Sequence, residues 1–378
     1  MRNPPPPVAG AASQGIQPRR DGLQEYAAVM PLLLGRLAAR ENLGRDAMAE
    51  AVDCIMRGEA SDEEIALLLT GLRHKGETVE EVAGAAEAMR RHMTPIRTTR
   101  TGLIDTCGTG GDNSGTFNIS TAAALVTAAA GVPVAKHGNR RVTSKTGSAD
   151  VLQRLGVNVD APLPLVEECL EELGICFCFA PLLHPAMRHV SEVRKKLGFT
   201  TIFNILGPLT NPAGASFQVL GVGRRELRDL LAGALQLLGV QHAAVVHGAD
   251  GLDEVTLAAI TEVTEVTPEE TQFFRWQPED FGLRREHLDA LAVDGPDDSA
   301  ALIRAVLAGE PGPPRDITVL NSAAAIWTAG VERSLTACAR RAAEAIDSGR
   351  ARELLVRLAH KTNRLKPAPV RPQGAADD

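Results

Sequence analysis

Beyond Thr98, short apolar runs alternate with longer stretches of helical periodicity, and this alternation is the strongest constraint on the fold. A succession of strands and helices is typical of a largely parallel sheet with helices on both faces. The sequence therefore predicts an α/β fold class, with helices at 121–130 and 225–238 among others. The runs predicted as strands are 103–104, 132–135, 157–159, 175–179, 201–203, 219–222 and 243–246.

Residues 26–98 show helical patterning throughout. Ser61 with Glu64, and Thr78 with Glu81, form two capping boxes, each placed before a periodic apolar segment. We therefore expect a small N-terminal all-helical domain ahead of the larger α/β domain. Its core is predicted to contain the apolar residues spaced three and four apart, which are Met48, Val52, Ile55, Met56, Ile65, Leu68, Leu69 and Leu72.

A chain of 378 residues is long enough for two domains. The two ends are rich in proline and polar residues and lack apolar periodicity, so we expect them to be flexible tails. The predicted organisation is a tail at 1–25, the helical domain at 26–98, the α/β domain at 99–365 and a second tail at 366–378.

The formal net charge of −7 argues against nucleic acid or an anionic membrane as the main partner. No run reaches the roughly 18 apolar residues of a membrane span. Arg2 and four prolines stand where a signal peptide has its apolar stretch. The six cysteines show no paired framework, which suits free thiols in a reducing compartment. We therefore expect a cytoplasmic protein whose anionic ligands bind at a local basic site.

The glycine-rich loop after the run 103–104 is the strongest candidate site. Glycine lets the backbone approach a phosphate closely, and successive N–H groups can form an anion nest. Ser120, Thr121 and the free N–H groups of the following helix would add donors. A tight structural turn is an equally good interpretation of such a loop taken alone. The glycines fall within eight positions and are Gly108, Gly110, Gly111 and Gly115.

The loop at 136–148 concentrates positive charge in an acidic chain. It contains Lys136, Arg140, Arg141 and Lys145, together with several hydroxyl residues. Ligands of parallel sheets bind beyond the carboxyl ends of the strands. Because this loop directly follows a predicted strand, we favour polyanion binding over a solvated charged surface.

Two further segments are weaker candidates when taken alone. Asp253 and Glu254 follow the predicted strand 243–246, and adjacent carboxylates suit Mg²⁺ bridging to substrate phosphates. Two neighbouring acids are nevertheless more often ordinary surface residues. His184 and Arg194 lie before the proline-flanked turn 207–212. Arginine is suited to bidentate recognition of a carboxylate.

In this order and at this spacing, these segments resemble those of the anthranilate phosphoribosyltransferases over residues 27–358. The motifs that carry the resemblance are GTGGD, FNIST, KHGNR, GSAD, FNILGPLTNP and DGLDE. The resemblance implies transfer of the phosphoribosyl group of phosphoribosyl pyrophosphate (PRPP) to the amine of anthranilate, a step of tryptophan biosynthesis. It also implies Mg²⁺ as cofactor, a homodimer formed through the helical domain, and a segment near 184–200 that returns to that domain.

The resemblance assigns the site residues. The PRPP-binding positions are Gly108, Gly111, Asp112, Thr116, Asn118, Ile119, Ser120, Thr121, Lys136, His137, Gly138, Asn139, Arg140, Arg141, Val142, Thr143, Ser144 and Ser148. The anthranilate-binding positions are Gly108, His137, Asn139, His184 and Arg194, and the magnesium positions are Ser120, Asp253 and Glu254. No nucleophile or general base is assigned, because a neutral arylamine needs only correct placement. Lys136, Asp253 and Glu254 act electrostatically.

Two alternatives stay open at this point. A pyrimidine nucleoside phosphorylase has the same broad architecture, but the loop 136–140 and the turn 207–212 argue against it. A non-catalytic relative could bind nucleic acid or a metabolite. The net charge, the 3% aromatic content and the Asp253–Glu254 pair argue against that second alternative.

Overall fold

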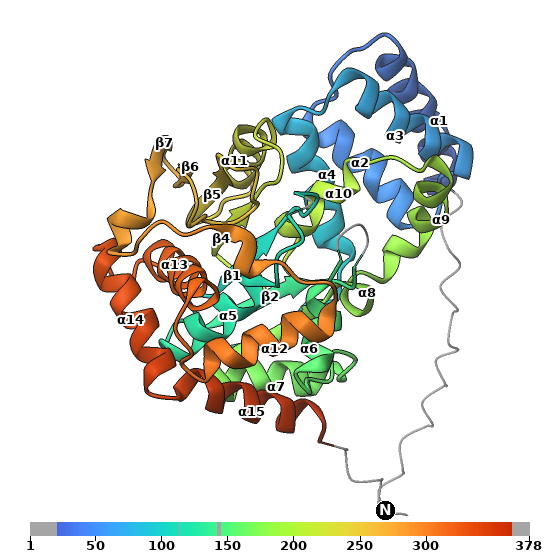
Figure 1. The fold of residues 1–378 in the computed structure, drawn as a ribbon. Coiled ribbons are helices and arrows are strands. Elements are labelled where there is room, and N and C mark those ends of the chain that lie inside the picture. Colours follow the sequence, from blue (N-terminus) through green and yellow to red (C-terminus); the bar gives the residue numbers. More distant parts are fainter. Residues whose placement is uncertain (1–20, 113, 142–144, 365–378) are drawn as a thin grey trace, which may run out of the picture.

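The computed structural model describes residues 21–112, 114–141 and 145–364, with side chains from residue 29 onward (Figure 1). The expectations for residues 1–20, Asn113 and 365–378 lie outside these residues. The same holds for three predicted PRPP-binding positions, which are Val142, Thr143 and Ser144.

Four helices form the N-terminal part of the described chain. They are α1 (Asp21–Ala38), α2 (Arg45–Met56), α3 (Asp62–Lys75) and α4 (Val79–His92). Both capping boxes are present, at Ser61–Glu64 and at Thr78–Glu81. The eight apolar residues predicted for the core are all buried. Helix α1 starts inside the segment 1–25 that we expected to be irregular. A helix formed further along the chain can extend at little cost, since each added residue gains a backbone hydrogen bond.

Seven strands form the central sheet in the order β3-β2-β1-β4-β5-β6-β7. The first five strands in this order are parallel, and β6 and β7 add an antiparallel edge that we did not predict. The sheet is thus mostly parallel, as expected. The strands are β1 (Ile104–Gly108), β2 (Val134–Gly138), β3 (Ile175–Phe179), β4 (Phe217–Gly221), β5 (His242–Gly248), β6 (Thr261–Val266) and β7 (Thr271–Trp276).

Helices flank this sheet and connect its strands (Figure 1). None of the described helices is both long and apolar enough to cross a membrane. The α-helices of this part are α5 (Ile119–Ala129), α6 (Ser148–Arg154), α7 (Leu163–Leu173), α8 (Ala180–Leu183), α9 (Arg188–Leu197), α10 (Phe203–Leu206), α11 (Leu227–Leu237), α12 (Pro296–Leu307), α13 (Pro313–Thr328), α14 (Leu335–Asp347) and α15 (Arg350–Thr362). Short 3-10 helices are η1 (Pro185–Met187), η2 (Gly207–Leu209), η3 (Pro278–Phe281) and η4 (Leu288–Leu291).

Two of the predicted strands are wrong. Residues 157–159 are buried, but their peptide groups bond to helix ends: Val157 donates to Leu152, and Asn158 donates to Thr362. Residues 201–202 lead into α10, which begins at Phe203, and Thr201 donates its N–H to the Asn204 side chain. Both runs are apolar because their side chains are buried against the hydrophobic core. Burial alone does not distinguish a strand from a buried connection.

The helical part and one face of the sheet share a single hydrophobic core. Val190 and Val193 of α9 pack into it with the helices α2 and α3, although α9 lies far along the chain (Figure 1). Leu220 and Val245 contribute from the strands β4 and β5. The elements α8 to α10 therefore lie at the junction between the helices and the sheet.

Candidate active site

The carboxyl ends of the central strands meet at one edge of the sheet. The register pairs Gly108 at the end of β1 with Gly221 at the end of β4. On the other side, Gly138 at the end of β2 pairs with Phe179 at the end of β3. The loops that leave these strands, and the loop after β5, consequently gather above the same edge.

A cavity of about 490 Å³ lies between these loops. Its walls come from the glycine-rich loop after β1, the basic loop after β2 and the acidic pair after β5. The lining residues are Cys107 to Asp112, Ser114 to Ser120, Lys136 to Arg141, Lys145 to Ser148, Asp253 and Glu254. Every described position that the resemblance assigned to PRPP therefore lines one cavity, with the exception of Thr121.

Lys136 forms the buried floor of this cavity, with 4% of its surface exposed. Its ammonium donates to the Thr106 carbonyl and, over 3.2 Å, to the Ser120 hydroxyl. Glu254 accepts the backbone N–H of Ser120 at 3.0 Å. Burial raises the pKa of Glu254 to about 7, while Lys136 and Ser120 act in the opposite direction. The floor thus places a cation and a carboxylate around one hydroxyl.

Asp253 lies beside the glycine-rich loop, where its Oδ2 accepts the Gly110 N–H at 3.0 Å. Burial and the neighbouring carboxylates of Asp112 and Glu254 raise the pKa of Asp253 well above its usual range. The protein therefore does not fully balance the negative charge of Asp112, Asp253 and Glu254. A divalent cation between them would stabilise their ionised forms.

This donor set fits Mg²⁺, which proteins bind through one or two carboxylates with waters and substrate phosphates completing the shell. Asp253 and Glu254 supply the carboxylates, and the Ser120 hydroxyl lies next to Glu254. Within the described residues, no group of three or more His, Cys, Asp or Glu side chains is arranged to hold a metal. A site of this kind needs oxygen ligands from the substrate.

The start of α5 differs from our expectation of free donors. The N–H groups of Ile119, Ser120 and Thr121 bond to Phe117, Glu254 and Asn118, respectively. The side chain of Thr121 is buried behind Lys136 and does not line the cavity. Successive helical residues point about 100° apart, so only some residues of the first turn can face the ligand.

The basic loop after β2 also keeps part of its charge away from the cavity centre. The Arg140 guanidinium donates to Gln153 and lies 3.4 Å from Asp150 and 3.5 Å from Asp160. Ser148 donates to the Asn139 carbonyl. A methyl group at Gly138 would come 2.2 Å from the Ser148 hydroxyl, so the two ends of the loop are tightly packed.

A second pocket, of about 550 Å³, opens on the side of the helical domain. It contains all five positions that the resemblance assigned to anthranilate. It shares Cys107 to Thr109 and His137 to Asn139 with the first cavity. The other lining residues are Met89, Ala180, Pro181, His184, Pro185, Met187, Arg188, Ser191, Arg194, Phe203, Asn204, Gly207, Pro208 and Thr210.

Arg194 is the half-buried cation of this pocket. Its guanidinium donates to the Asn204 side chain at 3.3 Å and lies over the Phe203 ring. No described carboxylate lies within 4 Å of it, and burial lowers its pKa. The two following lysines are exposed and each lies near an acid, Glu192 or Asp62. Arg194 therefore differs from its neighbours in the sequence.

His137 and His184 lie next to each other in the same pocket, with ring centroids 5.1 Å apart and ring planes tilted by 39°. His137 Nδ1 donates to the Gly207 carbonyl at 2.9 Å, so Nε2 carries a free lone pair. The Nε2 atoms of both rings are buried and have no partner among the described residues. Burial lowers the pKa of His137 to about 3 and that of His184 to about 4. Both rings are therefore neutral, with Nε2 able to accept hydrogen bonds.

The chain matches two family models. Residues 31–93 match the glycosyl transferase family helical bundle domain, and residues 100–352 match the glycosyl transferase family a/b domain. It is 50% identical to the anthranilate phosphoribosyltransferase of Anaeromyxobacter sp. over 325 residues, which cover 86% of this chain and 96% of the relative. The chain belongs to the anthranilate phosphoribosyltransferase family.

Solved structures of anthranilate phosphoribosyltransferases have the same fold. That of Thermus thermophilus superposes with a TM-score of 0.83 at 44% identity, covering 88% of this chain and 99% of the other. That of Saccharomyces cerevisiae, in complex with PRPP and Mg, gives 0.78 at 28% identity over 92% and 99%. Another structure of the yeast enzyme contains 4-fluoroanthranilate. The family agrees with our main prediction and with neither alternative.

Several lining residues were not predicted from the sequence. Met89 of α4, and Pro181 and Met187 between β3 and α9, enter the second pocket from separate elements. Gly221, the last residue of β4, and Gly223, two residues later, closely approach Asp253 and Asp112, respectively. The sequence Gly221-Val222-Gly223 at a strand end was the available signal for that approach.

Proposed function

We propose that this chain transfers the phosphoribosyl group of PRPP to the amine of anthranilate, with PRPP in the first cavity and anthranilate in the second pocket. The observation that carries the proposal is Arg194, a half-buried cation without an acidic partner among the described residues. Its pocket shares a wall with the first cavity, which is lined by the glycine-rich loop and the basic loop. A planar guanidinium can meet a benzoate-type carboxylate with two parallel hydrogen bonds.

The PRPP cavity supports departure of pyrophosphate. In the reaction, the bond from the ribose carbon to the pyrophosphate oxygen breaks, and its electron pair leaves with pyrophosphate. Mg²⁺ bound at Asp253 and Glu254 would supply charge neutralisation for the phosphates. Lys136 adds a fixed positive charge at the floor, where low dielectric strengthens its effect. The yeast relative in complex with PRPP and Mg supports this assignment.

The second pocket supports placement of the amine. With its carboxylate on Arg194, anthranilate would extend its amine toward the shared wall at Gly108 and His137. The neutral Nε2 atoms of His137 and His184 can accept the two amine N–H groups. This leaves the nitrogen lone pair free to form the bond to the ribose carbon, and the nitrogen then releases one proton to water.

A fluorescence assay tests this function. Anthranilate fluorescence should fall when PRPP and Mg²⁺ are both present, and stay constant when either is omitted. Thymidine with inorganic phosphate serves as the matched comparison for a nucleoside phosphorylase. Turnover of thymidine, without loss of anthranilate fluorescence, would overturn the proposal.

We also propose a homodimer formed through the helical domain. Leu32 of α1 is 66% exposed and Leu67 of α3 is 59% exposed, and these two helices pack against each other. Exposed leucines on adjacent helices favour burial against a second copy. Light scattering on Leu32→Glu with Leu67→Glu should show loss of the dimer.

A cytoplasmic location is part of the same proposal. All six cysteines are free thiols, and five of them are buried. Free cysteine thiols are typical of proteins in a reducing compartment.

A further inference from the structure

Residues 291–294, here called the strap, run beside the PRPP cavity; Leu291 ends η4, and the three residues after it lead toward α12. Their side chains alternate: Leu291 and Val293 are buried, whereas Ala292 and Asp294 are exposed. This alternation is that of a strand with one face on the core. The strap is not part of the seven-stranded sheet.

The strap pairs with the glycine-rich loop. Thr116 and Ala292 form an isolated antiparallel bridge. Phe117 donates its N–H to Leu291 at 2.8 Å, and Val293 donates to Gly115 at 2.9 Å. These bonds hold the part of the loop that leads into α5, including Thr116 on the cavity wall.

The strap is also bonded to the basic loop, through Lys145. The Lys145 ammonium donates to the Val293 carbonyl at 3.1 Å and to Asp294 at 3.0 Å. We had grouped Lys145 with the phosphate-binding cations, but its described bonds lead to the strap. Lys145 also passes within 4 Å of the position that a methyl group at Gly115 would take. Both PRPP loops are thus bonded to the same backbone segment, the glycine-rich loop through its backbone and the basic loop through Lys145.

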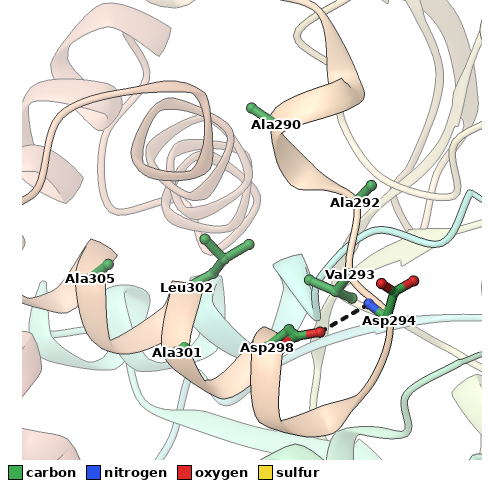
Figure 2. Close-up of a pocket in the computed structure, with 8 residues that line it drawn as sticks. All are labelled: Ala290, Ala292, Val293, Asp294, Asp298, Ala301, Leu302 and Ala305. Carbon is green, nitrogen blue, oxygen red and sulfur yellow. Dashed lines mark hydrogen bonds between the residues drawn. The ribbon is translucent and has the colours of Figure 1, made fainter.

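The opposite side of the strap faces an open groove of about 510 Å³ rather than packed protein (Figure 2). The groove separates the strap from Ala301, Leu302 and Ala305 of α12. The bond from the Asp294 N–H to Asp298, at 3.2 Å, ties the end of the strap to α12. The strap is held by the buried side chains of Leu291 and Val293 and by its bonds to the two loops, so these bonds supplement its packing on the core.

We propose that Lys145 is a positioning residue that sets the spacing between the two PRPP loops by clamping the strap. The bond from Lys145 to the Val293 carbonyl contributes most to this positioning. The ion pair with Asp294 contributes little, because Asp294 is 94% exposed and a surface pair is strongly screened. The inference rests on the proposed function, since it concerns how the PRPP cavity keeps its shape.

Lys145→Met tests the clamp, because methionine keeps much of the stem and removes the ammonium. The expected result is a loss of about 3- to 10-fold in PRPP affinity, with the KM for anthranilate within twofold of wild type. Asp294→Asn should change PRPP affinity by less than twofold. Val293→Pro, which removes the bond to Gly115, should reproduce the loss of PRPP affinity. Lys195→Met is the matched control, since Lys195 is exposed and lies outside both pockets.

Amide hydrogen exchange tests the same clamp without substrate. In Lys145→Met, the Phe117 and Val293 N–H groups should exchange faster than in wild type, and in Lys195→Met they should not. Unchanged exchange would overturn the clamp. So would a gain in PRPP affinity in Asp294→Asn, because Lys145 freed from Asp294 would then be binding phosphate itself. If wild type fails to bind PRPP while exchange responds as expected, the proposed function fails and the clamp stands.

Discussion

The backbone of Asp253 lies directly against Gly221. A methyl group at Gly221 would come 1.6 Å from the Asp253 carbonyl oxygen, closer than any real contact. Gly221 ends β4, and Asp253 follows β5, the next strand of the sheet. The absence of a side chain at Gly221 therefore lets Asp253, one of the two carboxylates proposed to bind the metal, approach the glycine-rich loop.

Gly221→Ala should displace Asp253 and Glu254 together. A shift of about 1 Å in a catalytic group can cost about 100-fold, and we expect a loss of at least about that size in kcat/KM. Steady-state kinetics at saturating Mg²⁺ measure it. Gly35→Ala is the control, because nothing lies within 4 Å of the added methyl group. Near-wild-type kinetics for Gly221→Ala would show that the acidic loop tolerates displacement.

Arg194→Ala should lose at least about tenfold in kcat/KM for anthranilate, since a charge-assisted hydrogen bond contributes about 1.5–3 kcal/mol. The KM for PRPP should change little, because Arg194 does not line the first cavity. Lys195→Ala and Lys196→Ala are controls on the same helix, and both should behave like wild type. Equal kinetics in all three variants would remove Arg194 from the anthranilate site.

Asp253→Asn combined with Glu254→Gln should remove most activity and raise the Mg²⁺ concentration needed for half-maximal rate. The amides lack the charge that binds the cation. The melting temperature should stay equal or rise, because burial disfavours the ionised acids. Glu269→Gln, in the exposed turn between β6 and β7, is the control. An unchanged Mg²⁺ dependence in the double variant would refute the metal assignment.

His137 and His184 should stay neutral across the working pH range. Their pKa values of about 3 and about 4 lie below the unfolded value of 6.5. Protonation therefore favours the unfolded chain. Their contribution to stability is complete above pH 6.5 and is lost as the pH falls from 6.5 to about 4 for His184 and to about 3 for His137. Imidazole NMR, assigned with His137→Gln and His184→Gln, should show no titration between pH 5.5 and 8. A midpoint near 6.5 for either ring would contradict this.

Glu81→Ala should destabilise the protein by about 3–5 kcal/mol, because it leaves a buried partner charge uncompensated. Glu81 is fully buried and accepts from Lys75, from the Thr78 N–H and from the Leu43 N–H. Glu64→Ala, at the same position of the other capping box but only half-buried, is the control and should cost about 1 kcal/mol. Equal losses in urea denaturation would mean that Glu81 acts only as a cap.

Local patterns were sufficient for much of the fold. The capping boxes at Ser61 and Thr78 and the apolar face through Leu68 predicted helices correctly, because capping and periodicity act within a few residues. The predicted strand at 157–159 was wrong for a tertiary reason, whereas the one at 201–203 was wrong because of a hydrogen bond within a single turn. Their peptide groups found partners in Thr362 and Asn204 instead of in a neighbouring strand.

For the site, the sequence by itself determined which residue types are present and which strand ends carry them. Glycines after β1, cations after β2 and acids after β5 predicted phosphate and metal chemistry at one edge. Only the tertiary structure decided which side chains face the ligand. It turned Thr121 inward, bonded Lys145 to the strap and left Arg194 without an acidic partner among the described residues. These outcomes depend on contacts between segments up to about 150 residues apart, such as Lys145 with Asp294. The local sequence does not indicate which group, distant along the chain, will form a hydrogen bond with a given donor.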